Sequence, residues 1–190
     1  MKHWKPAVIA ALWSGALYAA PMPVVASFSI LGDVAQQIGG ERVAVQSLVG
    51  ANQDAHAYNL TSGDIKKIRE ARLVLLNGLG LEKAELQRAV KQSKVASAEA
   101  TAGIKPLAAD EHHHEHNHGH DHDHGEFDPH VWNDPVLMQR YAANVAIALI
   151  KADPAGSRYY QQRFKDYQNV LNQLNNYANQ QFGAVAPAKR

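Results

Sequence analysis

The chain has 190 residues, of which 46% are hydrophobic, and a formal charge of +1 at pH 7. This length suits one globular domain, or one domain and part of a second, and the near-neutral charge gives no indication of a nucleic-acid partner. The sequence contains no cysteine, which excludes thiolate metal sites, cysteine redox chemistry and a lipid anchor on an N-terminal cysteine. Any metal site must therefore use nitrogen and oxygen ligands.

Residues 1–20 have the pattern of a secretory signal peptide. Two lysines precede about fourteen mostly apolar residues at positions 7–20, and this run is too short to span a bilayer as a stable helix. We expect cleavage near Ala19 or Ala20, which predicts a periplasmic mature chain without a membrane span. A first buried helix is the alternative.

Residues 21–153 are expected to form an N-terminal α/β lobe. Short β-branched runs at residues 24–30, 42–49, 72–77 and 94–98 alternate with helical patterns at residues 31–40, 62–71 and 81–92. Strands that alternate with helices of about ten residues predict a parallel sheet with flanking helices. Ligands of such sheets gather in the loops outside the carboxyl ends of the strands.

Residues 106–127 interrupt this pattern with a polar segment that we expect to be a mobile loop, because it cannot bury enough apolar surface to fold by itself. Between residues 111 and 125 it contains eight of the chain's eleven histidines and four carboxylates. Imidazole nitrogens suit zinc and copper. The predicted auxiliary metal ligands of this loop are His112, His113, His114, His116, His118, His120, His122 and His124.

The histidine-rich loop is expected to bind zinc weakly and with variable stoichiometry, because ordering a long polar segment costs conformational entropy. Its predicted role is to capture zinc and deliver it to a tighter site, or to sense high zinc. The alternative is a low-complexity segment without a function.

Two helices are predicted after this loop. Asp134 is the predicted N-cap of the first, with Pro135 at the first helical position, and a long linker helix is expected over residues 154–182. Apolar side chains recur in the long helix at intervals of four and three, which places them on one face. They are Tyr160, Phe164, Tyr167, Leu171, Leu174 and Ala178. Packing on the α/β body or on a following domain is favoured over a coiled coil.

Two histidines lie outside the rich loop and the signal peptide. His56 is in a loop that follows a strand, and His130 is in a loop that precedes a helix; each has an aspartate two residues earlier, Asp54 and Asp128. A single histidine is usually structural or simply exposed. Both of these, however, fall in the loops that an α/β sheet uses for binding, and a carboxylate can orient a ligating imidazole.

The fragments SFSILGD, DAHAY, NGLGLE and DPHVWNDP, with a histidine-rich insert before the last, occur here in an order that resembles the periplasmic solute-binding proteins of zinc and manganese ABC transporters. The resemblance covers roughly residues 24–190. It implies a metal bound between two α/β lobes joined by a long helix, with His56 and His130 at the first two ligand positions. A histidine-rich insert is typical of the zinc branch. Ala55 stands where the family usually has proline.

Proteins of this family continue after the long helix into a second lobe, which supplies a third histidine and usually an acidic ligand. We therefore expect residues 183–190 to be the start of a missing second lobe. Zinc commonly has three or four protein ligands, so His56 and His130 need further partners. The candidates are the loop histidines, Asp54, Asp128, water or a second copy of the chain.

The predicted function is that of a receptor that binds zinc with high affinity and delivers it to the membrane permease of an ABC transporter. The alternative is a periplasmic zinc buffer or metallochaperone that acts through the histidine-rich loop. A metalloenzyme is disfavoured because no predicted helix carries an H-E-x-x-H arrangement, and because Glu111 and Glu115 lie in a segment expected to be mobile. Copper and nickel would bind the same imidazoles.

Overall fold

The computed structural model describes residues 20–105, 127–183 and 185. Four strands form one parallel sheet in the order β2-β1-β3-β4. The strands are β1 (Met22–Phe28), β2 (Val43–Val49), β3 (Leu73–Leu76) and β4 (Ala96–Glu99). In the central strand, Val24 is in register with Val45 on one side and Leu73 on the other. The predicted parallel sheet with flanking helices and a long C-terminal helix is confirmed.

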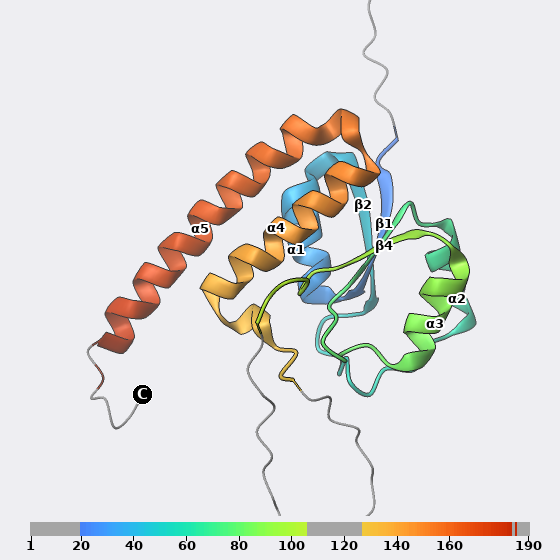
Figure 1. The fold of residues 1–190 in the computed structure, drawn as a ribbon, viewed down its shortest axis with the longest axis horizontal. Helices are drawn as coiled ribbons and strands as arrows, with labels where there is room; N and C mark the ends of the chain where they lie inside the picture. The colour runs from blue at the N-terminus through green and yellow to red at the C-terminus, as the bar shows by residue number, and fades with distance from the viewer. Residues whose placement is uncertain (1–19, 106–126, 184, 186–190) are drawn as a thin grey trace, which may run out of the picture.

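Helices cover both faces of this sheet. They are α1 (Ser29–Gly39), α2 (Ser62–Glu70), α3 (Ala84–Ser93), α4 (Pro135–Ala152) and α5 (Ser157–Gly183), with short 3₁₀ turns η1 (Gly40–Arg42), η2 (Val131–Asn133) and η3 (Pro154–Gly156). In Figure 1, α1 and α4 lie on one side of the sheet and α2 and α3 on the other, and α5 runs alongside α4 on the outside. Among the described residues, no helix has the length and apolarity needed to cross a membrane.

The central strand β1 is buried on both faces, which explains its continuous apolar run. Val24, Ala26 and Phe28 point into the larger core, which contains α1, α4 and the first half of α5. Val25 points to the opposite face and packs with Ile68 of α2 and other side chains of the smaller core. The carboxyl ends of the strands are thereby fixed from both sides.

Helix α4 begins where its sequence predicts. The Asp134 side chain accepts hydrogen bonds from the backbone N–H groups of Val136 and Leu137, at 2.7 and 3.3 Å, and Pro135 occupies the first helical position. A side-chain cap of this kind satisfies N–H groups that have no partner within the helix. It also fixes the direction in which the preceding segment, which carries His130, enters the helix.

The long helix α5 packs on the lobe through only part of its apolar stripe. Tyr160 and Leu171 are buried, and Phe164 and Tyr167 are partly buried against the same core. Beyond them Leu174 is 49% exposed. Packing of the stripe on the α/β body is therefore confirmed for its first half, and Leu174 in the second half is not covered by the described residues.

A polar cluster joins α4 to α5. The Arg42 guanidinium lies 2.7 Å from Asp153 Oδ2, which also accepts a hydrogen bond of 2.7 Å from the Tyr160 hydroxyl. The Arg42 side chain lies over the ring of Tyr160 as well. Burial and the bond to Asp153 raise the pKa of Tyr160 to about 12, so its hydroxyl stays protonated and donates. The start of α5 is thus fixed to the lobe by contacts from Arg42 of η1 and from Asp153, which lies between α4 and η3.

Candidate metal centre

His56 and His130, which are 74 residues apart in sequence, meet at the carboxyl edge of the sheet. Their Nε2 atoms are 3.1 Å apart and their ring centroids 5.2 Å apart. Two imidazole nitrogens that share one tetrahedral zinc ion at about 2.0–2.1 Å are separated by roughly 3.3 Å. The two rings therefore already lie at about the spacing of two ligands on one metal ion.

The ring of His130 is oriented by Asp128. One carboxylate oxygen, Oδ1, lies 2.6 Å from Nδ1 of the ring and accepts a hydrogen bond of 2.9 Å from the His130 backbone N–H. That backbone hydrogen bond lowers the pKa of Asp128, against the opposing effect of burial, so the carboxyl stays ionised. An ionised Asp128 assigns the ring proton to Nδ1, which leaves the lone pair of Nε2 free to face His56.

Aromatic contacts limit the rotation of the same ring. The rings of His130 and Trp132 meet in a T-shaped arrangement with centroids 5.1 Å apart, and the centroids of Trp132 and Phe28 are 4.8 Å apart. Phe28 is buried at the end of β1. The imidazole is therefore connected to the core, although its side chain remains 41% exposed.

The second aspartate has a different role. Asp54 Oδ1 accepts a hydrogen bond of 2.8 Å from the backbone N–H of His56, and no contact joins this carboxylate to the His56 ring in the described part of the chain. It shapes the loop, as aspartates in tight turns commonly do. Of the two aspartates considered from the sequence, only Asp128 contacts a histidine ring among the described residues, which is the ring of His130.

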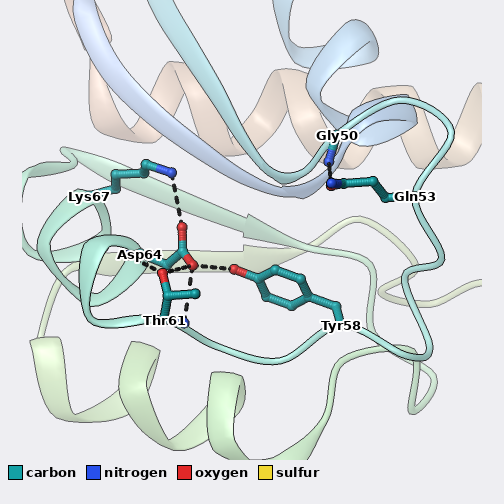
Figure 2. A network of polar contacts seen from close by, with 6 residues as sticks. All are labelled: Gly50, Gln53, Tyr58, Thr61, Asp64 and Lys67. Atoms are coloured by element: carbon teal, nitrogen blue, oxygen red, sulfur yellow. Dashed lines mark hydrogen bonds and ion pairs between the residues drawn. The ribbon is translucent and has the colours of Figure 1, made fainter.

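The His56 loop is attached to α2 through one carboxylate (Figure 2). Asp64 Oδ2 accepts hydrogen bonds from the Tyr58 hydroxyl at 2.5 Å and from the hydroxyl and backbone N–H of Thr61, and Oδ1 lies 2.9 Å from Lys67 Nζ. Burial alone would raise the pKa of Asp64, but the hydrogen bonds outweigh it and lower the pKa to about 2. Burial and the bond to Asp64 raise the pKa of Tyr58. Tyr58 therefore ties the chain two residues after His56 to the start of α2.

A second network, which sequence reasoning misses, lies beneath His130. The buried Glu82 accepts hydrogen bonds from the Ser27 hydroxyl at 2.7 Å and from the backbone N–H groups of Asn77 and Gly78 at 2.6 and 3.0 Å. Three of these residues belong to the NGLGLE fragment, in which Gly78 has a positive φ of 88°. The sequence signal that could have indicated this network is Asn77, a polar residue directly after the apolar run of β3. A buried amide must find hydrogen-bond partners.

A cavity of about 260 Å³ opens beside the histidine pair. Phe28, Ala55, Tyr58, Leu81 and Glu82 are among its lining residues, whereas neither histidine lines it. It therefore lies between the loop that carries the first histidine and the start of α3, next to the pair and not between its rings.

The described residues provide a pair of candidate ligands and not a full set. Residues 20–105, 127–183 and 185 contain no group of three or more His, Asp or Glu side chains arranged to hold a metal ion. The eight histidines of the rich loop, at positions 112–124, lie outside the described residues.

Comparison with known proteins assigns the chain to a family. The family described as zinc-uptake complex component A, periplasmic (ZnuA), matches residues 24–190. The chain belongs to the ZnuA family. The resemblance inferred from the sequence fragments is thereby confirmed, and the members that the chain resembles are substrate-binding proteins of metal ABC transporters.

Several relatives of this ZnuA-family chain have names that specify a metal. It is 30% identical to the manganese ABC transporter substrate-binding lipoprotein PsaA of Streptococcus anginosus over 89% of this chain and 54% of that protein. It is 32% identical to the iron-binding protein YfeA of Yersinia pestis over 80% of this chain and 46% of that one. The chain thus spans about half the length of these relatives, and their names differ in the metal.

Solved structures agree with the fold. The chain superposes on a point mutant of the periplasmic metal-binding protein of Candidatus Liberibacter asiaticus, in its manganese-bound form, with a TM-score of 0.76 and 30% identity, over 89% of this chain and 60% of that one. It also superposes on zinc-bound AdcA of Streptococcus pneumoniae with a TM-score of 0.70, over 83% of this chain and 32% of that one, at 21% identity, which supports the fold alone.

Proposed function

We propose that this chain forms the metal-capturing lobe of a periplasmic zinc receptor that delivers zinc to the permease of an ABC transporter, with His56 and His130 as two of the zinc ligands. The observation that carries the proposal is the 3.1 Å separation of the two Nε2 atoms. One of the two rings has its other nitrogen on a carboxylate, as ligating histidines commonly do.

Zinc is favoured over manganese by the chemistry of the donors. Two imidazoles suit zinc, copper and nickel, whereas manganese prefers oxygen ligands. The description of the family names zinc uptake, although relatives are named for manganese or iron. The histidine-rich loop, residues 106–127, adds nitrogen ligands and is proposed to collect zinc for the pair.

The remaining parts of the chain fit this role. Residues 1–20 are proposed to direct export to the periplasm, residues 21–153 to form the lobe, and residues 154–182 to form the linker helix, with residues 183–190 leading into a further lobe. Both imidazoles lie at the surface, where they can accept an ion from solvent. Since zinc commonly has three or four protein ligands, the pair gives an open set that further ligands complete in the loaded receptor.

The experiment that tests the proposal is a zinc titration against a competing chromophoric chelator, on the chain with residues 111–125 deleted. We expect one zinc ion per chain, and a loss of affinity of more than about tenfold in His56→Ala and in His130→Ala, since even residues that only support a ligand commonly cost that much. Asn59→Ala is the matched control, because Asn59 is exposed on the same loop as His56 and contacts Lys83 instead of the pair.

The same titration separates the competing interpretations. If the deletion removes all measurable zinc binding and the full chain binds several ions, a tight site formed by the pair within this chain is rejected, and the buffer or metallochaperone that acts through the loop is supported. A parallel titration with Mn²⁺ tests the metal. Tighter binding of Mn²⁺ than of Zn²⁺ at the pair would contradict the assignment of zinc.

A further inference from the structure

The His130 segment meets the end of the sheet at a buried amide. Asn77, which directly follows β3, is fully buried, and its Nδ2 donates a hydrogen bond of 3.2 Å to the backbone carbonyl of Pro129. This bond joins the segment to the end of a central strand. It reaches the residue immediately before a proposed metal ligand.

The Asn77 side chain has no freedom to turn away from this carbonyl. Its Nδ2 also donates to the carbonyl of Gly78 at 3.0 Å, and its Oδ1 accepts a hydrogen bond of 3.0 Å from the Tyr141 hydroxyl. Burial, together with the charge of Glu82, raises the pKa of Tyr141, so the hydroxyl stays a donor and fixes which end of the amide is the oxygen. Both ends of a fully buried amide are thereby bound.

The backbone of Asn77 is fixed as firmly as its side chain. Its N–H donates to Glu82 Oε1 at 2.6 Å, and its carbonyl accepts from the hydroxyl and the N–H of Thr101 at 2.6 and 3.1 Å. Glu82 in turn accepts from Ser27 of β1. Asn77 therefore transmits the position of three strand ends to the Pro129 carbonyl.

A planar peptide links Pro129 to His130, and both of its polar groups are bound. Its oxygen accepts from Asn77, and its N–H, which is that of His130, donates to Asp128 at 2.9 Å. Fixing the oxygen and the N–H of one peptide sets the orientation of its plane, and hence the direction in which the His130 side chain leaves the backbone. Because metal ligands tolerate little displacement, the orientation of this plane affects the affinity of the site.

We propose that Asn77 is a positioning residue of the metal site, which holds the Pro129–His130 peptide so that His130 Nε2 faces His56. This inference rests on the proposed function, since it assumes that His130 is a ligand. Asn77 itself touches no metal. Its effect is transmitted through the Pro129 carbonyl.

The test uses three variants in the chain that lacks residues 111–125: Tyr141→Phe, Asn77→Ala, and the double variant of both. Asn77→Ala alone leaves the Tyr141 hydroxyl buried without its acceptor, which lowers stability for a reason unrelated to metal binding. The double variant removes that hydroxyl as well. Urea denaturation should therefore show the double variant to be at least as stable as Asn77→Ala, and Tyr141→Phe is the matched control that keeps the bond to Pro129.

We expect the double variant to bind zinc about tenfold more weakly than Tyr141→Phe, in line with the usual effect of supporting residues around a metal. The absorption spectrum of bound Co²⁺ is a second readout. It reports the arrangement of the ligands, and a change in stability alone would not alter it. That spectrum should change in the double variant and not in Tyr141→Phe. If the double variant unfolds, Asn77→Ser carries the same expectation, because its hydroxyl is too short to reach Pro129.

Equal zinc affinity and an unchanged Co²⁺ spectrum in a folded Asn77 variant would overturn the positioning role. His130→Ala, measured alongside, separates this failure from a failure of the proposed function. If His130→Ala loses the zinc and the Asn77 variants do not, only the role of Asn77 is wrong. If His130→Ala keeps the zinc, the receptor site itself is wrong.

Discussion

Replacing Asp64 by asparagine should lower stability in a way that depends on pH. The fall of the Asp64 pKa from 3.8 to about 2 corresponds to about 2 kcal/mol of folding free energy when the carboxylate is ionised. Because the pKa is lower in the folded state, this contribution is fully present above about pH 4 and is lost as the pH falls through about 2. The side chain is only 6% exposed, so solvent screening removes little of it.

The assay is urea denaturation of the parent chain and of Asp64→Asn at several pH values between about 5 and 2. The difference between the two unfolding free energies should shrink by about 2 kcal/mol over this range, and all other carboxylates cancel because both proteins share them. Glu70→Gln is the matched control, since Glu70 is exposed on the same helix and its pair with Lys66 is 3.9 Å long. Parallel curves for the parent and Asp64→Asn would refute the reasoning.

Three further changes have clear expected results. Tyr58→Phe removes the hydrogen bond from the His56 loop to the buried carboxylate of α2 and should cost about 1–2 kcal/mol in urea denaturation and weaken zinc binding in the chelator assay. Asp128→Asn should weaken zinc binding by about 10- to 100-fold, and more than Asp54→Asn, because within the described residues the Asp54 carboxylate contacts a backbone N–H and no imidazole; equal losses would contradict the assignment. Gly156→Ala places a Cβ 2.5 Å from the Tyr160 ring and should lower the unfolding free energy by about 1–3 kcal/mol. An unchanged thermal midpoint would contradict this, because it would show that the α4–α5 junction can shift to make room for the Cβ.

Much of the fold can be predicted from the sequence because the local signals agree with the packing. The Asp-Pro pair predicts the cap of α4 at Asp134, and the apolar spacing predicts the long helix. The boundaries are less accurate where tertiary contacts decide them. The third helix is expected from residue 81, yet α3 begins at Ala84. Leu81 and Glu82 belong instead to the turn after β3, where Leu81 packs in the core and Glu82 accepts a hydrogen bond from the backbone N–H of Asn77.

The candidate site can be predicted only in outline. The loops of His56 and His130 indicate both histidines, and the structure brings them together, whereas their role as ligands stays a prediction. Asp54 and Asp128 each stand two residues before a histidine, so their spacing in the sequence cannot distinguish their roles. Each role depends on the conformation of the loop. The network around Asn77 is missed because its contacts join residues that are up to 64 positions apart in sequence, which no local pattern reports.

Helix α5 is fixed to the lobe along its first half, so its exposed second half must move whenever the lobe tilts. Its 27 residues extend for about 40 Å at about 1.5 Å per residue, and its contacts with the Arg42 and Asp153 cluster are all at its start. Because the helix moves with the lobe, a change of a few degrees in the tilt of the lobe about this cluster displaces the far end of α5 by a few ångströms. Tyr177 and Phe182, 60% and 63% exposed near that far end, are therefore where a small change in the tilt of the lobe becomes its largest movement.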